Sequence, residues 1–148
     1  MLFYTQQHVN FLKNKEILYP DPAFEDGYLK QFYPFMKQAY HDKINQDFDV
    51  SSGLIWGWPT ISEAFLYYED MPKSDVIIEA NIPDTQVLKS DFDAWHLVLN
   101  NYMPEIWPHI FSEEALHKDG FLEDADTFTP QLVIDHLDRK NICNVFYR

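Results

Sequence analysis

The segment from Val76 to Asn101 places the strongest constraint on the fold, because it combines a strand signal, a turn and a capped helix. Residues 76–78 are β-branched and suit a half-buried pleated surface. Pro83 with Asp84 supplies turn chemistry, and residues 86–88 form a short extended run. Ser90 then stands at the expected helix N-cap, with Asp93 in the capping-box position three residues later.

The helix that follows this cap carries its large side chains on one face. Helical spacing relates four residues, which are Phe92, Trp95, Leu99 and Tyr102. We therefore expect a strand pair packed against a helix whose Trp95 points inward, toward strands drawn from opposite ends of the chain.

The flanking segments predict further strands and helices. Strands are expected at residues 2–5, 54–58, 131–137 and 142–147. Helices are expected at residues 6–16, 28–44 and 61–68, with a helical turn capped by Ser112 at 112–116. The regular part of the long helix should begin near Tyr33, because Pro34 fits a first turn. Residues 61–68 are compatible with a helix started at Thr60 or with an extended segment, and we favour the helix.

This order of elements predicts one α+β domain over residues 1–148. Its mixed or antiparallel sheet should take strands from both chain ends, with the helices between them. A chain of 148 residues can bury a core without a disulfide or a metal, and its 46% of hydrophobic residues argues against disorder. No apolar run approaches the ~20 residues of a membrane span, and no signal-type segment begins the chain. We expect a cytoplasmic protein.

The formal net charge of −13 limits the partners. Direct nucleic-acid binding is not expected, because it depends on Lys and Arg neutralising phosphates. The charge allows two interpretations: solubility alone, or an acidic face that docks on a basic protein partner. The acids are scattered, with mild clusters at residues 113–114 and 123–126, and this favours the first.

Recognisable catalytic motifs are absent from the sequence. The six histidines form no metal-binding spacing, so no metal is expected. There is no nucleophile elbow, P-loop or dinucleotide-binding glycine pattern. The single cysteine, Cys143, lies in an apolar terminal strand, where a buried, inert thiol is expected.

Aromatic and polar residues supply the remaining candidates. Trp56, Trp58 and Trp95 suit either the core or the stacking wall of a pocket. His96 is either a hydrogen-bonded histidine at the core edge or a general base. Ser90 and Asp91 lie at a helix N-terminus, where capping explains them and a phosphate site is opposed by the aspartates.

Several blocks in chain order resemble one family. These blocks are LFYTQ, ILYPDPAF, YPFMKQAYHDKI, LIWGW, IPDTQVLKSDFDAWHLVLNN, IWPHIF and PQLVIDHLDRKNICNVFY. Together they are similar to the bacterial and phage domain-of-unknown-function family 3841, and SDFDAWHLVLN is the most specific of them. The segment between Trp58 and Val76 is shorter than that family implies. The resemblance implies no established activity.

A second resemblance is architectural, to compact ADP-ribosyltransferase-type α+β folds. It implies that Thr5 and Gln6 early, Tyr33 or Tyr40 in the middle, and Gln131 late flank a nicotinamide ribose. The chain departs from that pattern at Gln131, because glutamine cannot act as a carboxylate base.

We therefore predict a pocket for a nucleotide or another small molecule. Its predicted substrate-binding residues are Thr5, Gln6, Tyr33, Tyr40, Trp56, Trp58, Ser90, Asp91 and Trp95. Gln131 and His96 are the predicted catalytic residues. No cofactor is required by the residues; if the chain is an enzyme, we expect ADP-ribose transfer from NAD. The alternative is a non-enzymatic acidic module, such as a phage-type inhibitor of a host protein.

Overall fold

The computed structural model describes residues 1–13, 15–20, 31–66, 68–123 and 127–148. Its described residues form helices and antiparallel β-sheets, which confirms the α+β prediction. Strands from both chain ends belong to one sheet, and helices come between them in the sequence, as expected. The predicted helix start at residues 28–30 and the acids at 124 and 126 lie outside the described residues.

The first sheet joins the two ends of the chain through a central strand. Strand β4 (Asp75–Asn81) pairs antiparallel with β1 (Leu2–His8) on one side and with β8 (Ile142–Tyr147) on the other. Thr5 lies opposite Ile78, which in turn lies opposite Val145. The central position of β4 follows from its apolar run, which is buried from 76 to 78.

The second sheet has the order β3–β6–β5. Its strands are β3 (Ile55–Gly57), β6 (Pro130–Ile134) and β5 (Leu88–Asp91), all antiparallel. A two-bond bridge connects it to the first sheet: the Tyr4 amide donates to the Trp58 carbonyl at 2.9 Å, and the Trp58 amide donates to the Tyr4 carbonyl at 2.8 Å. β1 and β3 are therefore held side by side.

The predicted helix at residues 6–16 is wrong. β1 continues to His8, because residues 6–8 pair with Asp75 to Ile77 of β4. A short 3-10 helix, η1 (Val9–Leu12), follows, and then β2 (Ile17–Leu18), which pairs with β7 (Leu137–Asp138). Sheet hydrogen bonds to a distant strand outweigh the weak local helical spacing.

The helices begin where proline and capping residues place them, with one exception. α1 (Tyr33–Lys43) has Pro34 in its first turn, and α2 (Ile61–Ala64) is capped by Thr60. α4 (Glu113–Lys118) is capped by Ser112, as expected. For α3 (Phe92–Leu99), however, Asp91 caps the helix, and Ser90 belongs to β5.

The predicted inner face of α3 is too long, because the helix ends at Leu99. Asn101 then adopts a φ of 57°, and Tyr102 is 79% exposed. Short 3-10 helices also form at η3 (Tyr68–Asp70), η4 (Asp84–Gln86), η5 (Pro104–His109) and η6 (Arg139–Asn141). Residue 86 belongs to η4 and is therefore not extended, which corrects the prediction for residues 86–88. Cys143 is exposed on β8, which corrects the expected buried thiol.

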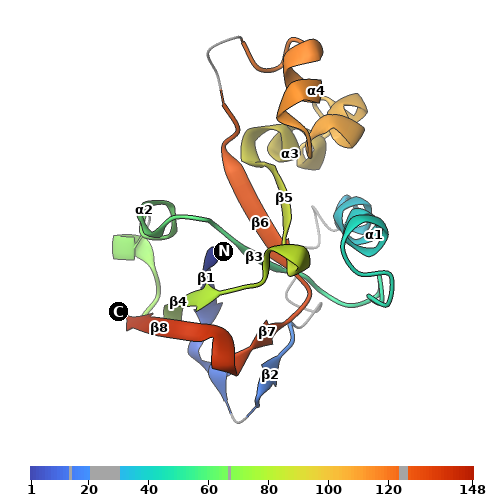
Figure 1. The fold of residues 1–148 in the computed structure, drawn as a ribbon. Coiled ribbons are helices and arrows are strands. Elements are labelled where there is room, and N and C mark those ends of the chain that lie inside the picture. Colours follow the sequence, from blue (N-terminus) through green and yellow to red (C-terminus); the bar gives the residue numbers. More distant parts are fainter. Residues whose placement is uncertain (14, 21–30, 67, 124–126) are drawn as a thin grey trace.

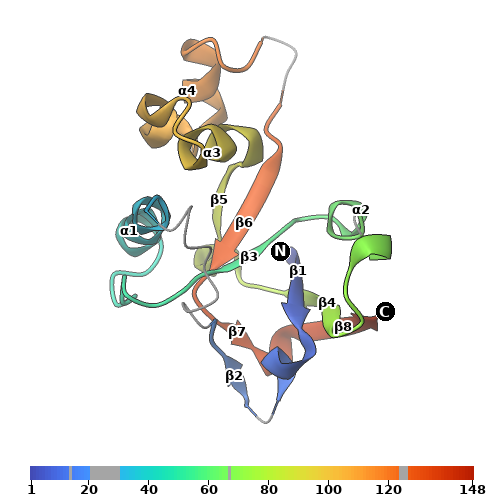
Figure 2. The same ribbon diagram turned by 180° about the vertical axis from the view of Figure 1, so that it is seen from behind.

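Two apolar clusters share β6 between them. Val133 packs with Trp95, Met36 and other residues of α1 and α3, whereas Leu132 and Ile134 pack under β1 and β4. Successive side chains of a strand point to opposite faces, so one strand can serve both clusters. In Figure 1, β6 runs from the region of α3 and α4 toward the first sheet, and Figure 2 shows the same arrangement from behind.

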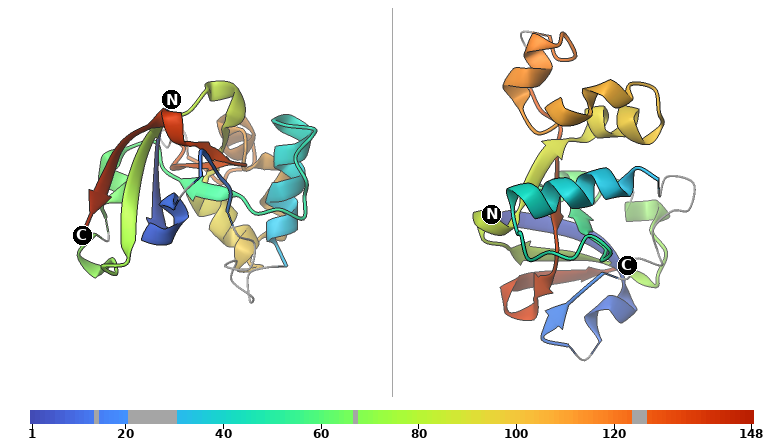
Figure 3. Two further views of the ribbon diagram at one scale, coloured as in Figure 1. Left: turned by 90° about the horizontal axis from the view of Figure 1, so that it is seen from below. Right: turned by 90° about the vertical axis from the view of Figure 1, so that its right-hand side faces the viewer.

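α1 lies along the flank of the second sheet, and β1, β4 and β8 form a curved layer beyond it (Figure 3). No described helix combines the length and the apolar character that crossing a bilayer would require.

Candidate functional site

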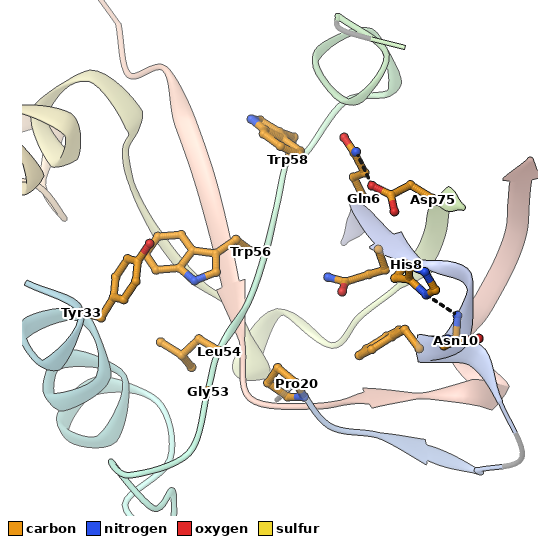
Figure 4. Close-up of a pocket in the computed structure, with 12 residues that line it drawn as sticks. Gln6, His8, Asn10, Pro20, Tyr33, Gly53, Leu54, Trp56, Trp58 and Asp75 are labelled. Atoms are coloured by element: carbon orange, nitrogen blue, oxygen red, sulfur yellow. Dashed lines mark hydrogen bonds between the residues drawn. The ribbon is translucent and has the colours of Figure 1, made fainter. Parts of the chain in front are cut away.

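A cleft of about 870 Å³ opens between the end of β1 with η1 on one side and β3 with the start of α1 on the other (Figure 4). This volume falls within the range of about 300–1,000 Å³ that is usual for small-molecule sites. The described lining residues are Gln6, Gln7, His8, Asn10, Phe11, Pro20, Tyr33, Gly53, Leu54, Trp56, Trp58 and Asp75.

One wall of the cleft is aromatic. Trp56 and Trp58 stand two residues apart on an extended segment, and Tyr33 at the start of α1 lies 6.0 Å from Trp56 between ring centroids. The Trp56 ring also stacks on buried Trp95, at 5.7 Å with 20° between the planes. Trp95 therefore supports the cleft wall from the core without lining the cleft itself.

The opposite wall is polar and rich in amides. The Gln6 amide donates to the Asp75 carboxylate at 2.8 Å, and the Gln7 amide donates to the Thr5 hydroxyl at 3.0 Å. The backbone amide of Asn10 donates to His8 Nδ1 at 3.1 Å, which leaves His8 Nε2 as the ring nitrogen that can donate. In Figure 4, Gln6, Asp75, His8 and Asn10 lie on the β1 side of the cleft, and Trp56 and Tyr33 lie on the other side.

Positive side chains are missing from the described lining residues. They include one carboxylate, Asp75, and no Lys or Arg. A phosphate group would therefore find no charged partner among them. What the walls can do is stack a flat ring and exchange hydrogen bonds with polar groups at its edge.

The structure brings four of the predicted site residues to this cleft: Gln6, Tyr33, Trp56 and Trp58. Thr5 lies beneath the polar wall, fully buried, and its hydroxyl donates to the Trp56 carbonyl at 2.6 Å. It therefore ties β1 to β3 and is not a described lining residue.

The other predicted residues lie elsewhere. Gln131 is buried in β6, and its amide donates to the Ser90 hydroxyl at 3.0 Å across the β5–β6 pair. Asp91 accepts from the Ala94 and Thr129 amides, both at 2.8 Å, so capping accounts for it. His96 Nδ1 lies 2.8 Å from the Phe92 carbonyl one turn back, as the core-edge interpretation expects.

Sequence reasoning missed the lining residues on the polar wall. The local spacing predicts a helix over Gln7, His8, Asn10 and Phe11, and no sequence motif points to Asp75. The one local signal is the absence of glycine and proline between residues 2 and 12, which allows β1 to extend. Which residues face Trp56 depends on the pairing of β1 with β4, which no local pattern reveals.

A second polar cluster surrounds Tyr40, which is buried and lies outside the cleft's described lining. Its hydroxyl donates to the Gln86 carbonyl at 2.6 Å and lies 3.1 Å from Asp135. Asp135 also accepts from Asn45 at 3.0 Å and Gln86 at 3.1 Å, and lies 2.8 Å from His136 Nδ1. Burial raises the pKa of Tyr40, and the nearby Asp135 carboxylate adds to this.

These hydrogen bonds set the ionisation of the cluster. Burial alone would raise the pKa of Asp135, but the hydrogen bonds from His136, Asn45 and Tyr40 outweigh it and hold this pKa at about 2. The hydrogen bond to Asp135 in turn raises the pKa of His136 above its ordinary value. The cluster links α1, η4 and the end of β6.

Stability should therefore depend on pH through this pair. Because the pKa of Asp135 is depressed, its contribution is present above its ordinary pKa of 3.8 and is lost as pH falls toward 2. Because the pKa of His136 is raised, its contribution is present below 6.5 and is lost as pH rises through the folded-state value. Urea unfolding of the wild type and Asp135→Asn should show that acidification from pH 5 to 2 costs the wild type about 1–2 kcal/mol more. Parallel curves for the two proteins would contradict this assignment.

The described part of the chain contains no group of three or more His, Cys, Asp or Glu side chains that could hold a metal ion. Comparison with known proteins yields no match, whether to protein-family models, to curated proteins or to solved structures. The resemblance to family 3841 stays a prediction.

Proposed function

We propose that this protein binds a small polar molecule with a flat ring, of nucleoside size, in the cleft between β1 and β3. The observation that carries the proposal is the pairing of an aromatic wall, Trp56, Trp58 and Tyr33, with an amide wall, Gln6, Gln7 and Asn10. Stacking on such rings contributes about 1–3 kcal/mol per base, and amides can read the polar edge of the ring.

The binding proposal does not extend to catalysis. ADP-ribose transfer from NAD would require Gln131 at the reacting ribose, but its amide is already engaged by Ser90 within a strand pair. The absence of Lys and Arg from the described lining also gives the pyrophosphate of NAD no charged partner. The alternative of an acidic module that docks on a basic protein is supported only by the net charge and stays a prediction.

A ligand titration tests the proposal. Tryptophan fluorescence and melting temperature should respond to nucleosides at millimolar concentration, because the ligand stacks on indole rings and stabilises the folded state. Gln6→Ala should weaken binding about threefold to tenfold, the loss of one hydrogen bond. Trp58→Ala should weaken it at least about tenfold.

The matched control is Gln38→Ala, which removes another exposed glutamine, on α1 and outside the described lining. Its affinity should equal that of the wild type. If neither nucleosides, nucleotides, NAD nor a smaller flat heterocycle changes the fluorescence or the melting temperature, the proposed function is wrong.

A further inference from the structure

Asp75 is the one Asp, Glu, Lys or Arg among the described lining residues of the cleft. One of its carboxylate oxygens accepts from Gln6 at 2.8 Å, and the other has no described hydrogen-bond partner. No described Lys or Arg forms a salt bridge with it, although Asp84, Asp138 and Glu114 elsewhere do pair with cations. The cleft therefore holds a negative charge that the described protein does not neutralise.

The facing wall suits a positive charge as well. The faces of Trp and Tyr rings carry negative electrostatic potential and attract cations within about 6 Å of the ring centroid. Trp56, Trp58 and Tyr33 supply three such rings in the same cleft as Asp75 (Figure 4). A flat cation between the walls would interact favourably with both.

The electrostatic field of the whole molecule also favours a cationic ligand. A net charge of −13 raises the local concentration of cations near the surface and lowers that of anions. An anionic ligand would have to overcome both this field and Asp75, without a described cationic side chain in the lining to compensate.

We propose that the ligand of this cleft is an organic cation whose charge is spread over a flat nitrogen heterocycle, of the N-alkylpyridinium type. The inference rests on the proposed function, because it assumes that the cleft holds a flat ring, and it adds the sign of the ligand's charge. Asp75 supplies the counter-charge, and the tryptophans supply the stacking surface.

Three probes that share one ring and differ in charge test the proposal. They are 1-methylnicotinamide, a cation, nicotinamide, which is neutral, and nicotinate, an anion. Fluorescence titration should show the cation binding at least about tenfold more tightly than nicotinamide, and nicotinate binding most weakly. Stacking on indole should also produce a charge-transfer absorption band with the cation, which Trp58→Ala should diminish.

The decisive variant is Asp75→Asn, which keeps a hydrogen-bond acceptor for Gln6 but removes the charge. The preference for the cation should then fall below about threefold. Asp42→Asn, the same change at an exposed carboxylate at the end of α1 that does not line the cleft, should keep the wild-type preference.

The outcomes separate the two proposals. Equal affinity for the cation and nicotinamide, or an unchanged preference in Asp75→Asn, would overturn the cationic ligand and leave the flat-ring cleft standing. Binding of neutral nucleosides without binding of the cation would do the same. If none of the three probes and no nucleoside binds, both proposals are wrong.

Discussion

Replacing Gly57 by alanine should lower the free energy of unfolding by about 3 kcal/mol, because the new methyl group has no room. A Cβ at this position would lie 2.5 Å from the Tyr4 carbonyl oxygen and 2.6 Å from the nearest atom of the Phe3 ring. The carbonyl is backbone and cannot turn aside, so β1 and β3 must separate. The melting temperature should fall by about 6–12 °C, and urea unfolding measures the free energy directly.

Gly120→Ala is the matched control for this substitution. Gly120 has a φ of 75°, where alanine is strained, but no atom lies within 4 Å of its new Cβ. We expect a loss of about 1 kcal/mol there, from backbone strain alone. Equal losses at the two glycines would show that β1 and β3 are not in close contact. The cleft between these strands should also lose ligand affinity in Gly57→Ala and keep it in Gly120→Ala.

Replacing Trp95 by alanine should cost about 4 kcal/mol, the usual loss for a fully buried aromatic side chain. Trp95 is 1% exposed and contacts Trp56 at 5.7 Å and Trp107 at 5.6 Å between ring centroids. Its removal leaves a cavity between α3 and the second sheet and takes away the stacking partner of Trp56. Denaturant unfolding followed by circular dichroism provides the measurement.

Trp95→Phe separates support of the cleft from stability. It keeps an aromatic ring in the core, so it should cost roughly half as much free energy as alanine. Ligand affinity should still fall, since Trp56 would be held less firmly, although Trp95 itself does not line the cleft. A loss below about 1 kcal/mol for Trp95→Ala would contradict the packing described for α3.

Local signals were sufficient where an element depends on its own residues. The start of α1 near Tyr33 follows from Pro34, and the caps at Thr60 and Ser112 follow from their hydroxyl groups. The strand at residues 76–78 follows from its β-branched run, and the burial of Trp95 follows from helical spacing. In each case the sequence signal lies within a few residues along the chain.

Ser90 shows where local reasoning stops. Ser90 and Asp91 are both good N-cap residues, and the sequence does not distinguish them. Because β5 pairs with β6, Ser90 lies in the sheet opposite Gln131, and Asp91 is the N-cap residue of α3. The same pairing lets the Gln131 amide donate a hydrogen bond to the Ser90 hydroxyl. Neither side chain is then available to the predicted pocket.

The sequence by itself determined the α+β class, the two strands at the chain ends, most helix starts and an acidic molecule rich in aromatic side chains. The tertiary structure alone decided which of those aromatic residues line a cleft and which fill the core. Trp56 and Trp95 are both large, flat and apolar, yet only Trp56 lines the cleft. The physical reason is that a cleft is formed by segments far apart in sequence: the pairing of β1 with β4 and its bridge to Trp58 bring residues 6–10 and 75 opposite 53–58.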